Sequence, residues 1–321
     1  MYDVVALGEL LIDFTENGDS AQGNPLFEAN PGGAPCNVLS LLQHLGNKTT
    51  FIGNVGDDMF GRLLKERAEK EGIDMSGLSL DKEVHTTLAF VHTFPGGDRD
   101  FSFYRKPGAD INLTVDDVKK NEGLIRDAKI FHIGTLSMTD EPACSATEYA
   151  LKVAKESGCL ISFDPNYRAP LWDSVEKAKE KIRYGFSMCD ILKISDNEIE
   201  LMTGETDLDK GIAKIREEFD IRLIFATAGP DGSKAYYKDI IVEMPGFKNE
   251  NTIETTGAGD TFCGSALHFA LEYGIDDLDE DKLKRLLTFA NAAASLITTR
   301  KGALSVMPTI EEVESFLKER S

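Results

Sequence analysis

The chain has 321 residues, of which 41% are hydrophobic and 28% charged, so it can bury a substantial core beneath a charged surface. With 35 Lys and Arg residues against 55 Asp and Glu residues, its formal net charge of -20 disfavours nucleic acid and anionic membranes as partners. The five cysteines are widely spaced and include no Cys-x-x-Cys pair, which argues against a disulfide framework and a zinc site.

The first residues, Met1 to Glu9, contain neither a basic segment nor a long apolar stretch. No segment approaches the roughly 18 consecutive apolar residues that a membrane helix needs. We therefore expect a cytoplasmic protein that is neither exported nor anchored.

Short apolar runs alternate along the chain with segments in which apolar residues recur at helical spacing. The runs predict strands buried on both faces, at 4–7, 50–52, 130–133, 160–163, 191–194 and 223–226. Helices are expected at 38–45, 60–68, 142–156, 174–187, 208–219, 258–273 and 281–298. A last helix follows Thr309, whose spacing to Glu312 makes a capping box. This alternation predicts a mainly parallel sheet.

Two early segments break the alternation. Residues 86–94 and 99–105 are rich in β-branched and aromatic residues and flank Pro95-Gly96-Gly97-Asp98, which predicts a hairpin. The runs 10–15 and 26–29, with a turn at Asn17-Gly18, predict a second one. Because two hairpins do not fit easily into a parallel sheet, we expect a small separate sheet that forms a lid. Its segments, about 10–30 and 84–106, would be insertions within a single domain of residues 1–321.

The strongest local motif is Thr-Gly-Ala-Gly-Asp at 256–260, which opens the predicted helix 258–273. The small residues Gly257, Ala258 and Gly259 leave the first N–H groups of the helix accessible, and the helix dipole favours an anion there. Asp260 would place a carboxylate beside a bound phosphoryl group, where it can act as a base toward an attacking hydroxyl. The alternative is an ordinary aspartate that caps the helix.

The chain has no Walker loop, and it lacks the glycines of a dinucleotide fingerprint after the first strand, which disfavours a Rossmann dehydrogenase. The motif at 256–260, with Gly264, resembles the C-terminal signature of the ribokinase-like (PfkB) carbohydrate kinases, and Pro-Gly-Gly-Ala-Pro-Cys-Asn at 31–37 resembles their N-terminal signature. Within that family the chain most resembles fructokinases, through the runs 8–14, 103–110 and 164–172. The resemblance extends from residue 4 to about 308.

That resemblance implies an α/β fold, a ribokinase-like three-layer α/β/α sandwich with a mainly parallel central sheet and a small β-sheet lid. The implied activity is ATP-dependent phosphorylation of a sugar hydroxymethyl group, that of D-fructose at its 6-hydroxyl, with Mg²⁺ as the metal. Asp260 would take the hydroxyl proton, while the amides of Gly257, Ala258 and Gly259 stabilise charge on the γ-phosphate.

The sugar-binding residues implied by the resemblance are Asp13, Gly32, Gly33, Asn37, Arg105 and Arg168. The two glycines would let the backbone approach the sugar, and the Asp and Asn side chains hydrogen-bond hydroxyls well. Each assignment has a plainer alternative: a tight turn followed by a capping Asn, a strand Asp that faces solvent, and two arginines that are surface charge.

The nucleotide-side residues implied by the resemblance are Ser195, Glu198, Thr227, Gly229, Gly232, Asn291 and Ser295. Those at 227–232 resemble the family's phosphate and ribose turn. Glu198 takes the place of the Glu in the family's Asn-x-x-Glu motif, which orders the water bound to magnesium, and Ser195 replaces its Asn. Asn291 and Ser295 match adenine-side positions, although small polar residues also suit an Ala-rich packing helix.

The resemblance also implies a potassium ion beside the anion site, between an acidic residue and the loop 299–305. Here the acidic residue is Glu254, followed by Thr256. A Glu keeps the charge but adds a methylene, and the alternative is that it faces solvent. We further expect a homodimer through the lid, because the second face of its aromatic strands would otherwise be an exposed apolar patch.

Two other functions remain open. A 2-keto-3-deoxygluconate kinase would use the forks of Arg105 and Arg168 to bind the carboxylate of its substrate. A binding protein that senses a sugar or nucleotide would keep the pocket without the reaction, but the intact Asp260 and the glycines before it disfavour that reading.

Overall fold

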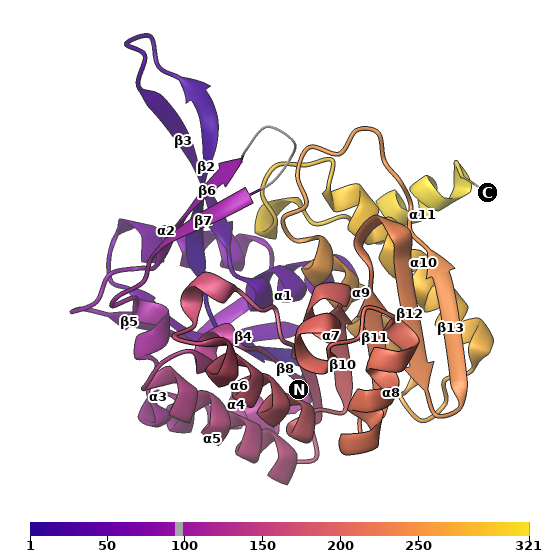
Figure 1. Ribbon diagram of the computed structural model, residues 1–321. Coiled ribbons are helices and arrows are strands. Elements are labelled where there is room, and N and C mark those ends of the chain that lie inside the picture. The colour runs from indigo at the N-terminus through magenta and orange to yellow at the C-terminus, as the bar shows by residue number, and fades with distance from the viewer. Residues whose placement is uncertain (94–98, 321) are drawn as a thin grey trace.

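In the computed structural model, which describes residues 1–93 and 99–320, the strands form two sheets (Figure 1). The larger sheet has the order β13-β12-β11-β10-β9-β8-β1-β4-β5. Neighbours from β5 to β11 are parallel, whereas β12 pairs antiparallel with β11 and with the edge strand β13. Its strands are β1 (Tyr2–Leu7), β4 (Thr49–Gly56), β5 (Asp74–Asp81), β8 (Ala128–Gly134), β9 (Leu160–Asp164), β10 (Ile191–Ser195), β11 (Leu223–Thr227), β12 (Gly232–Tyr237) and β13 (Ile240–Pro245).

Helices cover both faces of the large sheet, so the domain has three layers. Alternate residues of β1 show the division: Val4 and Ala6 join one core cluster, and Val5 and Leu7 join the other. One layer holds α1 (Ala34–His44), α2 (Met59–Lys70), α9 (Ala258–Tyr273), α10 (Glu280–Ile297) and α11 (Ile310–Lys318). The opposite layer holds α3 (Val115–Lys120), α4 (Glu122–Arg126), α5 (Ala143–Glu156), α6 (Val175–Met188), α7 (Asp196–Thr203) and α8 (Leu208–Glu218). The predicted sandwich is confirmed.

The smaller sheet has the order β3-β2-β6-β7, with β2 (Leu11–Asp19), β3 (Pro25–Gly32), β6 (Leu88–Thr93) and β7 (Arg99–Tyr104). It stands apart from the large sheet, and the β2–β3 hairpin projects from the body of the molecule (Figure 1). A parallel pairing of β2 with β6 joins the two hairpins. The predicted small separate sheet is confirmed, whereas the turn expected at Pro95–Asp98 lies outside the described residues.

The turn predicted at Asn17-Gly18 is wrong. Strand β2 continues through both residues to Asp19, with a register irregularity between Glu16 and Asp19. The positive φ of Gly18, 75°, therefore serves this irregularity and not the turn. The chain reverses after Ser20, whose amide donates to the carbonyl of Asn24 at 2.8 Å.

The predicted capping box is confirmed: Thr309 and Glu312 form it at the start of α11. Among the described residues, no helix is both long enough and apolar enough to cross a bilayer.

Candidate active site

Two cavities meet at the N-terminus of α9, where both are lined by Thr255 and Gly259. The first, which we call the polar cavity, measures about 390 Å³ and lies between the small sheet and the ends of β9 and β10. The second, the apolar cavity, measures about 420 Å³ and lies between α9, α10 and the end of β11. Charged lining residues belong mainly to the polar cavity: Glu9, Asp13, Arg168, Lys193, Glu198 and Asp260.

The small residues at the N-terminus of α9 let a ligand approach the backbone closely. Gly257 is the N-cap and has a left-handed φ of 78°, and a Cβ at this position would lie 2.8 Å from that of Ala303. No described side chain caps the helix. The Ala258 amide donates to the Thr255 carbonyl at 3.3 Å, and the N–H groups that follow it are left for a ligand. A Cβ at Gly259 would lie 3.1 Å from the Lys193 ammonium. An anion bound here would meet the helix dipole and a cation together.

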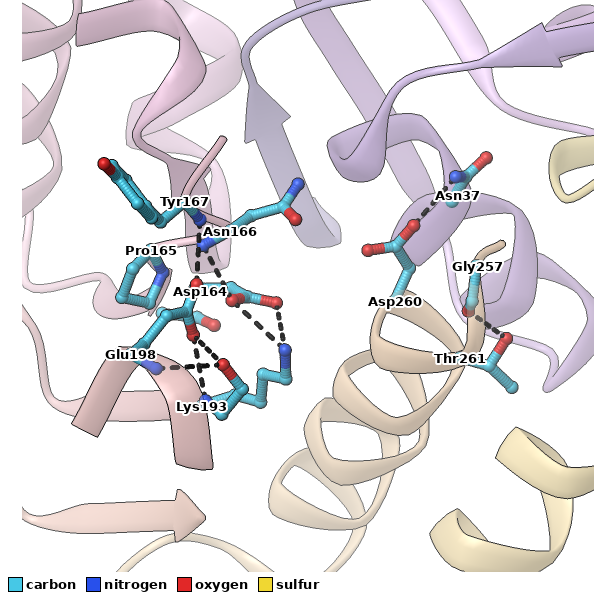
Figure 2. A network of polar contacts seen from close by, with 12 residues as sticks. Asn37, Asp164, Pro165, Asn166, Tyr167, Lys193, Glu198, Gly257, Asp260 and Thr261 are labelled. Atoms are coloured by element: carbon cyan, nitrogen blue, oxygen red, sulfur yellow. Dashed lines mark hydrogen bonds and ion pairs between the residues drawn. The ribbon is translucent and has the colours of Figure 1, made fainter. Parts of the chain in front are cut away.

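Asp260 extends from the first turn of α9 into the polar cavity (Figure 2). Its Oδ2 accepts a 2.8 Å hydrogen bond from Nδ2 of Asn37 on α1. Removal from water raises the pKa of Asp260 to about 6, although the bond from Asn37 opposes the increase. The Oδ1 of Asn37 is buried and has no partner among the described residues, so a ligand hydroxyl would satisfy it.

Asp13, on β2, faces the same cavity. Burial raises its pKa to about 7, against the attraction of Arg168. Gly32 lies on the neighbouring strand β3, where a side chain would collide with the Asp13 carboxylate. Gly33, the N-cap of α1, lines the cavity with a φ of 122°. These two glycines therefore make room for the carboxylate and for a ligand.

Sequence reasoning did not identify Glu9 as a site residue. Its carboxyl lines the polar cavity, and its Oε1 accepts a 2.9 Å hydrogen bond from the amide of Ala34. Burial raises the pKa of Glu9 to about 7. Glu9 fixes the start of α1, where no described side chain caps the helix. Its place in the Gly8–Phe14 run was the available signal.

The two arginines differ. Arg168 is exposed and lines the polar cavity. Arg105 is 4% exposed, absent from the described lining, and bound to three partners. It pairs with the Asp110 carboxylate at 2.6 Å, and donates to the Leu136 carbonyl at 2.7 Å and the Thr139 hydroxyl at 3.0 Å. The structure therefore brings Arg168 to the other site candidates and uses Arg105 to attach the end of β7 to 136–139.

Lys193, also missed from the sequence, lies on β10 and lines the polar cavity. It is 8% exposed, and its Nζ lies 3.0 Å from Oδ2 of Asp164 (Figure 2). Burial opposes its charge, but Asp164 and Glu198 outweigh that effect and raise the pKa of Lys193. Ser195 and Glu198 form the capping box of α7 and line the polar cavity. One apolar-looking run, 191–194, therefore carries a buried cation.

Thr227, Gly229 and Gly232, together with Asn291 and Ser295, line the apolar cavity. Asn291 is fully engaged: its Nδ2 donates to the carbonyls of Met244 and Pro245, both at 3.1 Å, and its Oδ1 accepts from Ser233 at 2.8 Å. Because these bonds fix its side chain, Asn291 shapes the wall of the apolar cavity.

Ser295 differs from its neighbour on α10. Its Oγ is buried and without a partner in the part of the chain that the structure describes. This hydroxyl is available to a ligand.

Glu254 does not simply face solvent. Its Oε1 accepts a 2.8 Å hydrogen bond from the amide of Gly302, which joins the segment before α9 to the loop 299–305. Thr256 lines the polar cavity on the same segment.

Comparisons with known proteins all find similarity to carbohydrate kinases. The family pattern "pfkB family carbohydrate kinase" matches residues 1–310. "Probable fructokinase-2" of Arabidopsis thaliana is 41% identical over 317 residues, covering 98% of this chain and 95% of that protein. A putative ribokinase II from E. coli, in complex with ATP and Mg²⁺, has a TM-score of 0.86 and 27% identity over 99% of this chain and 100% of its own. A fructokinase double mutant from Vibrio cholerae O395, with fructose, ADP and a potassium ion bound, has a TM-score of 0.86 and 27% identity, with 98% of each chain covered.

Proposed function

The chain belongs to the pfkB family of carbohydrate kinases, and we propose that within this family it is a fructokinase, which transfers the γ-phosphoryl group of ATP to the 6-hydroxyl of D-fructose. The observation that carries this proposal is the position of Asp260. Its carboxylate enters the polar cavity within the first turn of α9, bonded to Asn37 and not to the helix amides. That geometry favours a base over an ordinary helix cap.

Fructose would occupy the polar cavity, with its hydroxyls bound by Asp13, Asn37 and Arg168. As the 6-oxygen attacks the γ-phosphorus, its proton passes to Asp260 and the bond to the oxygen shared with the β-phosphate breaks, releasing ADP. A pKa of about 6 leaves Asp260 ionised at neutral pH and more basic than an ordinary aspartate. The amides of 257–259 would stabilise the charge on the transferred group.

ATP would occupy the apolar cavity, which joins the polar cavity at Thr255 and Gly259. The turn 227–232 would lie along the phosphates and ribose. The hydroxyl of Ser295 would contact the base, against the wall shaped by Asn291.

Magnesium would be held by the ATP phosphates and water, with Glu198 as the carboxylate beyond the water. Mg²⁺ commonly keeps several waters and binds through one or two carboxylates together with substrate phosphates. When bound, the ion neutralises phosphate charge.

A potassium ion would lie beside α9, ordered by Glu254 and Thr256 together with the loop 299–305. The bond from the Gly302 amide to Glu254 supports this assignment, because it brings the two segments together. We expect potassium to raise kcat, and Glu254→Gln to weaken that activation. Equal rates in potassium and tetramethylammonium at matched ionic strength would count against the site.

The alternative substrate, 2-keto-3-deoxygluconate, is not favoured. Its carboxylate would call for both arginines, but Arg105 is engaged by Asp110, Thr139 and the backbone. Of the two arginines, Arg168 alone lines the polar cavity.

We also propose a homodimer through the small sheet. One face of that sheet carries Phe14, Phe27, Phe90 and Tyr104, whose rings contact one another. Phe27 is 36% exposed and Tyr104 is 66% exposed, so a second copy would cover apolar surface there. A monomeric mass at micromolar concentration would refute the dimer.

The test of function is an acceptor screen with ATP and magnesium. Fructose, 2-keto-3-deoxygluconate, ribose, tagatose and adenosine are compared at one concentration and then by kcat/KM. We expect fructose to be the best acceptor by about tenfold or more, a difference of about 1.4 kcal/mol in the transition state. A higher kcat/KM for any other acceptor would overturn the assignment to fructose.

A further inference from the structure

The turn after β9 delivers two side chains, Asn166 and Arg168, to the polar cavity. It does so in a conformation that a non-glycine residue rarely adopts, since Asn166 has a φ of 44°. Such a backbone persists only when its surroundings hold it in place. What holds this turn therefore controls how the cavity presents Asn166 and Arg168.

Three elements hold the turn. From the end of β8, the amide and hydroxyl of Thr135 donate to the Pro165 carbonyl at 3.3 and 2.5 Å. From β9 itself, Oδ1 of Asp164 accepts from the Asn166 amide at 3.1 Å. The third contact comes from α7, where Oε1 of Glu198 accepts from the Tyr167 amide at 2.8 Å (Figure 2).

Glu198 makes a bridge with this third contact. Its other oxygen, Oε2, accepts from the Ser195 amide at 2.9 Å and from the Ser195 hydroxyl at 2.8 Å. The side chain is 6% exposed, so its three bonds are charge-assisted contacts largely shielded from water. One carboxylate thus ties the start of α7 to the backbone between the two residues that reach the cavity.

We propose that Glu198 is a positioning residue for the acceptor: through the Tyr167 amide it holds the 164–168 turn so that Asn166 and Arg168 can bind the sugar. This inference rests on the proposed function, and it adds to the magnesium role of Glu198 an effect that is present without nucleotide or metal. Loss of the carboxylate leaves the Tyr167 amide without its acceptor and the strained Asn166 less constrained. The sugar should then bind more weakly before ATP arrives.

The turn has a built-in reporter. Trp172 is the only tryptophan in the sequence, and it follows the turn through a short 3₁₀ helix, Ala169–Leu171. It is 8% exposed and packs in one of the two core clusters. Because Leu171 bonds back to the Arg168 carbonyl at 3.0 Å, loosening of the turn should increase the access of solvent to Trp172.

The experiment compares Glu198→Gln and Glu198→Ala with wild type in the absence of ATP and magnesium. Calorimetry gives the fructose Kd, and acrylamide quenching gives the accessibility of Trp172. We expect Glu198→Ala to raise the fructose Kd about tenfold or more and to increase quenching, because one shielded charge-assisted bond is lost. Glu198→Gln keeps one acceptor oxygen, so its fructose Kd and its quenching should lie between those of Glu198→Ala and wild type. Should Glu198→Ala fail to fold, Glu198→Gln carries the test.

Glu312→Gln is the matched control. It makes the same change in the same motif, the capping box of α11, away from the lining of the polar cavity. It should leave the fructose Kd within about twofold of wild type and the quenching unchanged. Any general effect of weakening a helix N-terminus would appear here too.

A fructose Kd that stays within about twofold of wild type in both Glu198 variants overturns the proposal, whatever the fluorescence shows. A role confined to magnesium gives that result, since no metal is present. If wild-type protein binds no fructose, the proposed function fails instead. Quenching then tests only whether Glu198 holds the 164–168 turn: greater quenching in the Glu198 variants supports that part, and unchanged quenching overturns the proposal.

Discussion

The two cavities that meet at Gly259 are lined by different kinds of residue. The polar cavity gathers charged side chains from the small sheet, β10 and α9, and it raises the pKa values of Glu9, Asp13 and Asp260 by taking them out of water. The apolar cavity is lined mainly by glycines, alanines, phenylalanines and threonines, and the side-chain amide of Asn291 in its wall already has its hydrogen bonds. Chemistry should therefore depend on single side chains in the first cavity, whereas binding in the second should depend on shape.

The largest effect should come from the base. Asp260→Asn keeps the shape of the polar cavity but removes the proton acceptor, so we expect kcat to fall by roughly 10² to 10⁴-fold. ATP affinity, measured by calorimetry, should change little, because the apolar cavity is untouched. A variant within about threefold of wild-type kcat would contradict the role of Asp260.

The N-terminus of α9, where the two cavities meet, can be tested by substituting a glycine. Gly257→Ala places a Cβ 2.8 Å from that of Ala303 and strains a left-handed residue, which should disturb the N–H groups of α9 and lower kcat by about 10- to 100-fold. Steady-state kinetics and thermal unfolding should be measured together. Gly46→Ala is the matched control: Gly46 is also left-handed, with a φ of 85°, but a Cβ there meets nothing within 4 Å. Equal kcat losses in both variants would show that only stability had changed.

The pH dependence of kcat/KM tests the polar cavity, because the carboxyls with raised pKa values lie there. Asp260 must be ionised to accept a proton, so kcat/KM should fall as the pH drops below a pKa of about 6. Asp13, with a pKa of about 7, should broaden this acid limb, since the two carboxyls interact. In Asp13→Asn a narrower limb near pH 6 should remain, with a raised KM for fructose. A wild-type profile that is flat from pH 5 to 8 would be inconsistent with these pKa values.

The smallest effect should come from the apolar cavity. Ser295→Ala removes its unpartnered buried hydroxyl, and we expect the KM for ATP to rise about two- to fivefold with kcat unchanged, as for one neutral hydrogen bond. Ser265→Ala is a suitable control, because Ser265 is fully buried on α9 but bonds to the Thr261 carbonyl and is absent from the described lining. If Ser295→Ala lowered kcat strongly, the division of labour between the cavities would be wrong.

The sequence contained most of the fold, because strands buried on both faces and amphipathic helices leave periodic apolar patterns. It missed three strands of the large sheet, β5, β12 and β13. The two edge strands, β5 and β13, have a mixed pattern of burial, and β12 pairs antiparallel with its neighbours. It also misplaced the β2–β3 turn, since an Asn-Gly pair suits a bulge as well as a turn.

The candidate site was only partly predictable, for a physical reason. Motifs made of consecutive residues, such as 256–260, can be read locally. Lys193 has no such local motif, and the only local signal for Glu9 is its place in the run 8–14. Their roles arise from residues far along the chain: Asp164 for the lysine and Ala34 for the glutamate. Arg105 is the reverse case: its residue type suggests a ligand-binding cation, but the sequence does not show that Asp110, Thr139 and the Leu136 carbonyl already bind its guanidinium.

The identity of the product is the sharpest test of whether the chain phosphorylates fructose at its 6-hydroxyl. Wild-type protein is incubated with fructose, ATP and magnesium, and the sugar phosphate is identified by phosphorus and carbon NMR. We expect fructose 6-phosphate with one ADP formed per sugar phosphate, and no sugar phosphate from Asp260→Asn on the same time scale. Phosphate on another oxygen, or ADP release without a sugar phosphate, would contradict it.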